Sequence, residues 1–320
     1  MVSHVCTRIS PFMPIITIFG ANGTQGSAVL LAVLADGKYT PRAVSRSLES
    51  PASNALIEKG VEVVAANLWD KESLKKAIRG SQVVFGNTNF WDPEIFPADP
   101  QGKGELTQGR NLVDAAKEEG VKLFIYSSLP NATKSSNGRY KNIYHTDNKA
   151  IIEDYLRASG VPCAVLLTGW FLDNLWKPGR PALKKTETGY HIPIAKFGPD
   201  DVQEFTWVAH DFGQAAVALL RHYGTEGGDK VLGRSFPVVS FKTTYSKLAA
   251  AIAKGIKQEV NFTPLETSGQ RLFDEMYLFQ KECGMYPKTP APNPDLVALG
   301  VKFGTLEEYV EEAVFPRFAD

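Results

Sequence analysis

The chain has 320 residues, and its 35 Lys and Arg side chains balance its 35 Asp and Glu side chains, so the formal net charge is zero. A hydrophobic fraction of 43% and only three cysteines indicate a globular protein and exclude a disordered chain, a collagen-like repeat and a disulfide scaffold. Nucleic-acid-binding domains normally carry a basic surplus, so the neutral balance argues against that class too.

The first half of the chain alternates strand-like and helix-like segments. Short apolar runs predict strands over 15–19, 42–45, 61–66, 82–85, 123–126 and 162–167. Helical spacing predicts helices over 27–34, 52–59, 71–79 and 143–158, and one more that ends near residue 119. Apolar strands that alternate with helices form parallel sheets covered on both faces. The sequence therefore predicts an α/β fold, a doubly wound parallel sheet of the Rossmann type, over 14–167.

The second half, 168–320, predicts a smaller α+β lobe, with some segments returning to the parallel sheet. Prolines and glycines over 168–205 indicate loops and short strands. Helices are expected over 211–223, with Asp211 as the N-cap, and over 244–254, 273–282 and 306–314. Four prolines in 287–294 predict an extended surface connection.

Cysteine spacing and hydropathy indicate the cellular setting. Cys6, Cys163 and Cys283 are far apart and offer neither zinc-ligand spacing nor a disulfide framework, so we expect no metal site. Residues 1–14 lack the pattern of a signal peptide, and no apolar stretch is long enough to span a bilayer. We expect a soluble, cytoplasmic chain, or a nuclear one if it acts as a regulator.

A glycine-rich turn follows the first predicted strand, in the order Gly20-x-x-Gly23-x-x-Gly26. Gly20 permits a tight turn, Gly23 lets the backbone approach a pyrophosphate, and Gly26 allows the helix to pack closely on the strand. The residues between them, Asn22, Thr24 and Gln25, lie at the helix N-terminus, where free N–H groups bind phosphates. The turn predicts a dinucleotide site, the alternative being a glycine turn without a ligand.

The end of the second predicted strand bears on which dinucleotide is preferred. A carboxylate there would bind the ribose of NAD, but the segment contains Ser45, Arg46 and Ser47 and no acid before Glu49. A guanidinium with flanking hydroxyls suits a 2′-phosphate. We therefore expect NADP(H) in preference to NAD(H), unless Arg46 is merely an exposed loop residue.

Residues at other strand ends complete the expected cofactor site. Asn67 and Leu68 follow the third strand, where adenine contacts are expected. Thr88, Asn89 and Phe90 follow the fourth strand and are expected beside the pyrophosphate and the nicotinamide ribose. Ser127, at the end of the fifth strand, is placed to contact a ribose or substrate hydroxyl, although it could equally cap the strand.

Several segments together resemble a known family. They are the glycine turn, Thr88-Asn89-Phe90-Trp91, the helix 105–116, the strand 124–129, the pair His145-x-x-x-Lys149, the segment 169–175 and the helix start 211–217. The sequence resembles the NmrA-like branch of the atypical, extended short-chain dehydrogenase/reductase superfamily. The resemblance implies one of two activities. Some relatives are NADPH-dependent reductases, including enzymes of fungal secondary metabolism, and others bind the nucleotide and act as regulators through protein partners.

The resemblance also implies a catalytic pair. The wider superfamily uses Tyr-x-x-x-Lys, in which the Lys lowers the pKa of the Tyr and holds the nicotinamide ribose. Lys149 matches the Lys, but His145 stands in place of the Tyr. The i,i+4 spacing puts both on one helix face, and a His can donate a proton near neutral pH. Tyr144 is a further candidate proton donor. Alternatively, Lys149 pairs with Glu153 on a solvated face.

Aromatic residues supply the expected substrate contacts. Trp170, Phe171, Asn174 and Trp176 follow the sixth strand, where ligands bind in open α/β sheets, and Trp91 faces them from another loop. These aromatics could instead join the two lobes. His191, His210 and His222 lack metal-ligand spacing and are expected to be structural.

The leading hypothesis is an NADP(H)-dependent reductase of a carbonyl or activated double bond in a small aromatic or polyketide-type molecule. The rival is a nucleotide-sensing regulator that acts through a protein partner, and the missing tyrosine favours it. A redox-neutral isomerase or cyclase is a third option. No direct nucleic-acid or membrane partner is expected, and the oligomeric state stays open.

Overall fold

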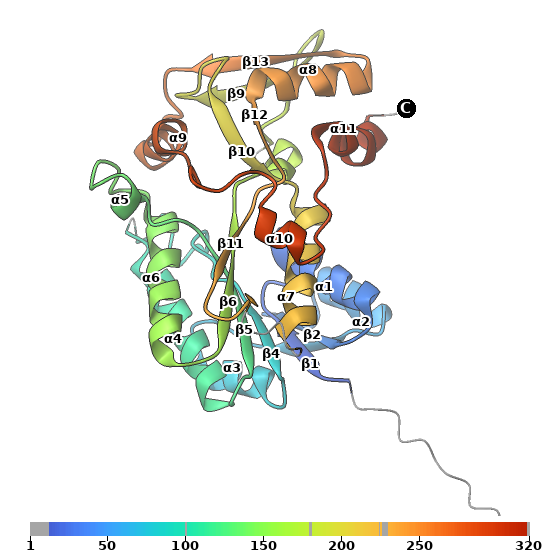
Figure 1. Cartoon of the computed structure of the whole chain (residues 1–320), viewed down its shortest axis with the longest axis vertical. Coiled ribbons are helices and arrows are strands. Elements are labelled where there is room, and N and C mark those ends of the chain that lie inside the picture. Colours follow the sequence, from blue (N-terminus) through green and yellow to red (C-terminus); the bar gives the residue numbers. More distant parts are fainter. Residues whose placement is uncertain (1–12, 100, 179–180, 224, 226–229, 319–320) are drawn as a thin grey trace, which may run out of the picture.

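The computed structural model describes residues 13–99, 101–178, 181–223, 225 and 230–318. Cys6 and nearly all of the segment considered for a signal peptide lie outside these residues. The chain forms a doubly wound α/β half and a second lobe beyond one edge of its sheet (Figure 1). In the described part of the chain, no helix combines the length and the apolar character needed to cross a membrane.

The main sheet has seven strands, and every neighbouring pair is parallel. They run in the order β11 (Ser235–Val238), β6 (Cys163–Thr168), β5 (Leu123–Ser128), β4 (Val83–Gly86), β1 (Ile15–Ile18), β2 (Thr40–Ser45) and β3 (Glu62–Ala65). This is the predicted Rossmann arrangement, extended by a strand from the second half. The strand order reverses between β1 and β4, and open α/β sheets bind ligands at that point.

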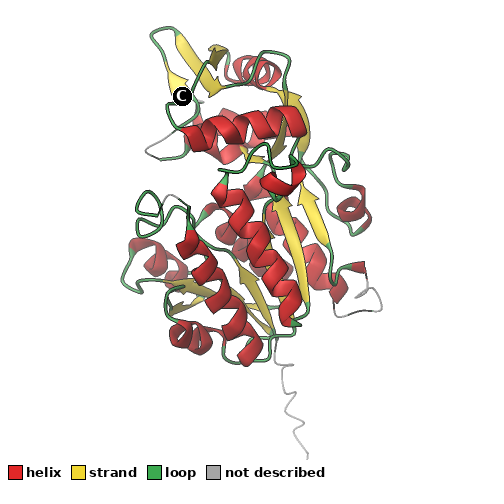
Figure 2. Ribbon diagram, turned by 90° about the vertical axis from the view of Figure 1, so that its left-hand side faces the viewer, coloured by secondary structure: helices red, strands yellow, loops and turns green. Residues whose placement is uncertain are grey.

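Helices cover both faces of the sheet, as predicted. In Figure 1 α1 (Thr24–Asp36), α2 (Pro51–Glu58) and α7 (Gly213–Tyr223) lie on one side. The other side carries α3 (Lys71–Ile78), α4 (Lys103–Glu118) and α6 (Tyr144–Ser159). The carboxyl ends of the long strands face the second lobe (Figure 2). Ligands bound at that edge therefore lie between the two lobes.

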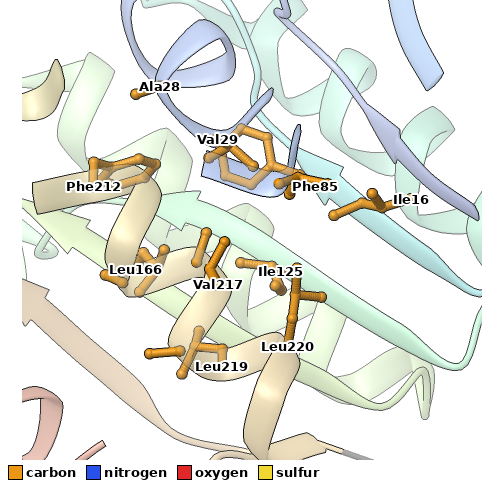
Figure 3. Packing of buried hydrophobic residues seen from close by; sticks show 14 of the residues in the cluster. Ile16, Ala28, Val29, Phe85, Ile125, Leu166, Phe212, Val217, Leu219 and Leu220 are labelled. Carbon is orange, nitrogen blue, oxygen red and sulfur yellow. The ribbon is translucent and has the colours of Figure 1, made fainter. Parts of the chain in front are cut away.

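Close packing fixes the helices on the sheet. Figure 3 shows Ile16, Phe85 and Ile125 of the strands packed against Val29 of α1 and Val217 of α7. Burying one such side chain stabilises the fold by roughly 1.5–3 kcal/mol. A second core lies on the opposite face and includes the buried free thiol of Cys163. Burial raises the pKa of that thiol, so it behaves as a small apolar side chain.

Among the described residues, the second lobe has two three-stranded sheets, and its longer helices are α8 (Tyr245–Ile256) and α9 (Arg271–Cys283). One sheet has the order β12 (Phe241–Thr244), β10 (Val202–Thr206), β7 (Trp170–Phe171). The other has the order β13 (Glu259–Leu265), β9 (Gly189–Ala195), β8 (Lys184–Lys185). Edge-to-face contacts among Trp170, Phe205 and Tyr245 form its core. These elements are the predicted α+β lobe.

Short elements complete the chain: α5 (Ala132–Ser135), α10 (Pro294–Ala298), α11 (Leu306–Tyr309), the 3₁₀ turns Leu172–Trp176 and Phe315–Arg317, and the π turns Val208–Phe212 and Val310–Val314. The expected N-cap role of Asp211 is wrong, because a π turn carries the chain into α7. Asp211 is instead buried, where it contacts His210, Ser240 and the backbone N–H of Gly304. The proline-rich segment 287–294 is irregular up to Pro294, although its Asn293 is buried and caps α10.

Candidate active site

Two cavities open at the carboxyl edge of the main sheet. The glycine-loop cleft, of about 540 Å³, is lined by Phe19, Gly20, Asn22, Gly23, Thr24, Gln25, Val44, Ser45, Arg46, Ser47, Ser50, Ala66, Asn67, Leu68, Asn87, Thr88, Asn89, Asp92 and Gln108. The aromatic cavity, of about 550 Å³, lies between the lobes. Thr88, just after β4, lines both cavities. The two spaces are therefore neighbours at the point where the strand order reverses.

The glycine turn has the geometry that its sequence predicts. Gly20 adopts a left-handed backbone conformation (φ +68°), and the N–H of Gly23 donates to the carbonyl oxygen of Gly20 at 2.8 Å. A Cβ on Gly26 would lie 2.1 Å from the carbonyl oxygen of Gly20, so only glycine allows α1 to start this close to β1. No side chain caps α1, whose N-cap is Gly23. Thr24 and Gln25 in its first turn line the cleft, and the free N–H groups of a helix N-terminus fit the phosphates of a dinucleotide.

The polar end of β2 forms another wall of the cleft. Ser45, Arg46 and Ser47 all line it, and Ser50, the N-cap of α2, adds another hydroxyl. The side chain of Arg46 is 70% exposed, and its Nη1 lies 3.3 Å from Oδ2 of Asp92, which is buried. A cation and hydroxyls suit a phosphate ester at this position, whereas Asp92 competes for Arg46. Sequence reasoning missed Asp92, because it follows β4 in a long irregular loop.

Lys149 points inward rather than to solvent, so the alternative pairing with Glu153 is wrong. Its Nζ donates to the carbonyl oxygen of Thr88 at 2.9 Å and to the Thr88 hydroxyl at 3.0 Å, and it lies 3.0 Å from Glu105 Oε1. Glu105 is fully buried, and the Thr88 hydroxyl also donates to it. Glu153 instead accepts from Arg157 on its own helix. The cluster Lys149, Glu105 and Thr88 thus sets a charged group at the border between the cavities.

Glu105 was not predicted as a site residue. It lies in the first turn of α4, three residues before Gln108, which lines the cleft, whereas Glu105 lies behind Lys149 and Thr88 and lines neither cavity. A buried carboxylate needs a cation beside it, and Oε2 of Glu105 has no hydrogen-bond partner among the described residues. A glutamate near a helix N-terminus is common in sequences, so only the fold reveals that it faces Lys149.

His145 lies in the wall of the aromatic cavity, against the rings of Phe90 and Trp91. Burial, with a smaller contribution from the charge of Lys149, lowers the pKa of His145 to about 3. The imidazole is therefore neutral at pH 7 and is no source of an imidazolium proton. Tyr144 points elsewhere, since its hydroxyl donates to Asn142 Oδ1 and it does not line the cavity. The structure brings neither predicted proton donor to the site in a form suited to that role.

Other predicted cofactor residues divide between the two cavities. Asn67, Leu68 and Asn89 line the glycine-loop cleft. Phe90 is almost fully buried and faces the aromatic cavity instead of the cleft. Ser127 also faces that cavity, and its hydroxyl accepts from Gln25 Nε2 at 2.7 Å, which ties the glycine turn to β5.

The aromatic cavity takes residues from both lobes. Its lining comprises Thr88, Phe90, Trp91, Ser127, Ser128, Leu129, His145, Thr146, Lys149, Thr168, Gly169, Trp170, Phe171, Asn174, Lys177, Pro181, Ala182, Lys184, Pro193, Ile194, Ala195, Leu265, Ser268, Phe273, Met276, Tyr277, Gln280 and Met285. Four predicted substrate residues, Trp91, Trp170, Phe171 and Asn174, are among them. The ring of Trp91 stacks on Phe273 of α9, with centroids 5.6 Å apart. No residue of α9 was predicted from the sequence as a substrate contact, because the helical pattern of 271–283 does not indicate which residues line the cavity.

Trp176, the fifth predicted substrate residue, does not line the cavity. Its ring stacks on Tyr309 of α11, and the guanidinium of Arg317 lies 4.2 Å from the ring centroid. Trp176 therefore packs against the C-terminal elements within the second lobe, which is neither the expected substrate contact nor the alternative of joining the two lobes. No group of three or more His, Cys, Asp or Glu side chains in the described ranges could hold a metal ion.

Comparison with known proteins agrees with this geometry. The family model "NmrA-like family" matches residues 14–310. The chain is 28% identical to the NmrA-like family domain-containing oxidoreductase ptmS of Penicillium ochrochloron, over 94% of each chain. It superposes on the negative transcriptional regulator NmrA in complex with NADP with a TM-score of 0.74 at 21% identity, over 95% of this chain and 96% of that one.

A second solved structure is similar over nearly the same length. NADPH-dependent quinone oxidoreductase QOR2 from Escherichia coli, complexed with NADPH, gives a TM-score of 0.69 at 21% identity, over 92% of this chain and 98% of that chain. Both structural likenesses establish the fold. The family model spans nearly the whole sequence, so the chain belongs to the NmrA-like family.

Proposed function

We propose that the protein is an NADP(H)-dependent reductase that delivers a hydride to an electron-poor acceptor held in the aromatic cavity. One observation carries the proposal: the glycine-loop cleft and the aromatic cavity meet at Thr88, and the ammonium of Lys149 is hydrogen-bonded to that residue. A dinucleotide in the cleft would have its nicotinamide at this border, and an acceptor in the cavity would lie beside it.

The glycine turn and the uncapped start of α1 would hold the pyrophosphate, with Asn67 and Leu68 beside the adenine. Arg46, Ser47 and Ser50 would hold the 2′-phosphate, and this is the reason to prefer NADP(H) over NAD(H). Similar solved structures are complexes with NADP, with NAD and with NADPH, which supports a dinucleotide here, and the preference for NADP(H) rests on this chain's own residues.

When bound, the reduced nicotinamide supplies a hydride from its C4 atom. Lys149 would supply the positive charge that stabilises an oxyanion forming on the acceptor. The ion pair with the buried Glu105 would hold the Lys149 ammonium in position. The Lys149 ammonium already donates to Asn87 Oδ1 and to the carbonyl and hydroxyl oxygens of Thr88, so Lys149 acts by charge rather than by giving up a proton.

The state of His145 narrows the class of acceptor. With a neutral imidazole and with Tyr144 turned away, neither of the two proton donors expected from the sequence is placed to act as an acid at neutral pH. A quinone or an activated carbon–carbon double bond gives a delocalised anion on hydride uptake, which can take its proton from water. The balance is NADPH plus acceptor plus H⁺ giving NADP⁺ plus the reduced acceptor. We therefore favour such acceptors over simple ketones, whose alkoxide needs a positioned acid.

The test is NADPH consumption with a panel of naphthoquinones, unsaturated ketones and simple ketones. We expect turnover with the first two classes and little with the third. Turnover of simple ketones with a step in rate near pH 6.5 that disappears in His145→Gln would contradict the assigned role of His145. Tight NADPH binding without consumption for any acceptor would favour the regulator alternative, in which a protein partner reads the bound nucleotide.

A further inference from the structure

The charged side chains that line the aromatic cavity are all positive among the described residues. Among its described lining residues are three lysines, Lys149, Lys177 and Lys184, and no aspartate or glutamate. The three come from different parts of the fold: Lys149 from α6, Lys177 from the end of the 3₁₀ turn that follows β7, and Lys184 from β8. The remaining wall is largely aromatic and aliphatic, so these cations dominate the potential that a ligand meets.

The lysines differ in how their charge is balanced. Lys149 is only 13% exposed and has the buried carboxylate of Glu105 at 3.0 Å. Lys177 and Lys184 are exposed, and no carboxylate of the described chain lies within 4.0 Å of either ammonium. Two positive charges thus remain available to a ligand.

The unbalanced pair, Lys177 and Lys184, also comes from the lobe that does not form the glycine-loop cleft. Lys177 and Lys184 belong to the second lobe, with Asn174 on the same segment, and none of the three lines the glycine-loop cleft. Lys149 belongs to the Rossmann half and is bonded to Thr88 at the border with the cleft. A ligand that reaches from Thr88 to the second lobe therefore meets Lys149, whose charge Glu105 balances, at one end. At the other end it meets Lys177 and Lys184, whose charges no described carboxylate balances.

We propose that the natural acceptor is an elongated, mostly apolar molecule that carries an anionic group, such as a carboxylate, remote from its reducible group. Lys177 and Lys184 bind the anion through their ammonium groups, while their aliphatic stems continue the apolar wall. The aromatic side chains contact the body of the molecule, and the reducible group lies beside Lys149. Cationic acceptors are repelled. This assignment of substrate class rests on the proposed reductase function.

The test compares a matched pair of probes, a 1,4-naphthoquinone with a propanoate side chain and its methyl ester. Lys177→Gln and Lys184→Gln should each raise the KM of the acid about 3-fold, and the double variant about 10-fold, which is the scale for partly exposed ion pairs. The KM of the ester and the kcat of both probes should stay as in the wild type. Lys185→Gln is the matched control, because Lys185 is the neighbouring exposed residue of β8 and does not line the cavity.

Binding is measured separately, by the fluorescence of Trp91 and the other tryptophans during titration with each probe in the presence of NADP⁺. Equal affinity for acid and ester in the wild type, or an equal loss for both probes in the double variant, would overturn the anion site. If the acid binds more tightly than the ester, loses that advantage in the double variant, and yet is never reduced, the anion site stands and the reductase function fails.

Discussion

The glycine-loop cleft is lined mainly by residues at the ends of neighbouring strands of one sheet, whereas the aromatic cavity is lined by residues of both lobes. In the cleft, the glycine turn and the ends of β2, β3 and β4 follow from the Rossmann topology alone. In the cavity, Trp91 meets Phe273, which is 182 residues away in the chain. The first region is specified by local sequence and the second by tertiary packing. The same contrast predicts that substitutions will act differently in the two regions.

The largest effect is expected from Gly26→Ala in the cleft. The new Cβ would lie 2.1 Å from the carbonyl oxygen of Gly20, so the turn must shift. We expect a loss of about 3 kcal/mol in the free energy of unfolding, the upper range for overpacking, and a loss of NADPH binding. Thermal melts with and without NADPH measure both. Ser27→Ala, which removes only a hydroxyl bonded to Thr24, is the control and should change neither appreciably. A Gly26→Ala protein that binds NADPH normally would refute the close-packing argument.

At the border between the regions, Lys149→Met should reduce turnover about 100-fold, as is typical when an electrostatic stabiliser is removed. It should also lower the free energy of unfolding by about 3 kcal/mol, because Glu105 is left buried without a cation.

The double variant Lys149→Met, Glu105→Gln separates these two effects. It should recover most of the stability while turnover stays low. Lys134→Met, at an exposed ion pair, is the control and should alter stability by less than about 1 kcal/mol. Recovery of turnover in the double variant would show that the charge of Lys149 is not needed for the reaction.

The buried His145, in the cavity wall, should make the free energy of unfolding depend on pH. Its pKa is about 3 in the folded chain, below the ordinary value of 6.5, so the unfolded state binds the proton more readily between these values. Stability is therefore lost as pH falls below 6.5, by about 2 kcal/mol between pH 7 and pH 5 for this one group. Denaturant unfolding at the two pH values should show a smaller loss in His145→Gln than in the wild type. An identical loss in both proteins would mean that His145 titrates normally.

Within the cleft, Arg46→Ala should weaken NADPH binding about 10-fold and leave NADH binding nearly unchanged, since only NADPH carries the 2′-phosphate. Asp92→Asn should have the opposite effect, tightening NADPH about 3-fold, because it frees the guanidinium. Arg79→Ala, an exposed arginine remote from the cleft, is the control. Calorimetric titration gives the Kd values. Equal losses for both nucleotides in Arg46→Ala would contradict the preference for NADP(H).

Effects smaller than that of Arg46→Ala are expected from two tryptophans that the sequence does not distinguish. Trp91→Leu should raise the KM for aromatic acceptors about 5-fold through loss of a stacking wall in the cavity. Trp176→Leu should leave KM unchanged and lower the free energy of unfolding by about 1 kcal/mol, since its ring stacks on Tyr309. Steady-state kinetics and chemical unfolding of both variants give the comparison, and a KM effect in Trp176→Leu would place it at the substrate.

These contrasts explain which features were predictable. The parallel sheet, the glycine turn and the candidates at strand ends follow from apolar periodicity and from the rule that ligands bind at the carboxyl edge. The direction of Lys149 does not, because its partner Glu105 lies on another helix and neither residue type indicates burial. Trp176 and Tyr144 were misplaced for a related reason: sequence gives the position of a residue along a turn or helix, and packing decides which way it points.

The central claim is that the two cavities form one reaction site. NADPH deuterated at C4, prepared separately in its two stereochemical forms, tests it most directly when it is incubated with a naphthoquinone or an unsaturated ketone. For the unsaturated ketone, we predict that only one of the two deuterated forms of NADPH puts deuterium into the product and shows a primary isotope effect. The reason is that the cleft would fix one face of the nicotinamide toward the cavity at Thr88. For both acceptors, transfer should fall sharply in Lys149→Met. Stable binding of NADPH with no deuterium transfer and no isotope effect for either form would contradict the account.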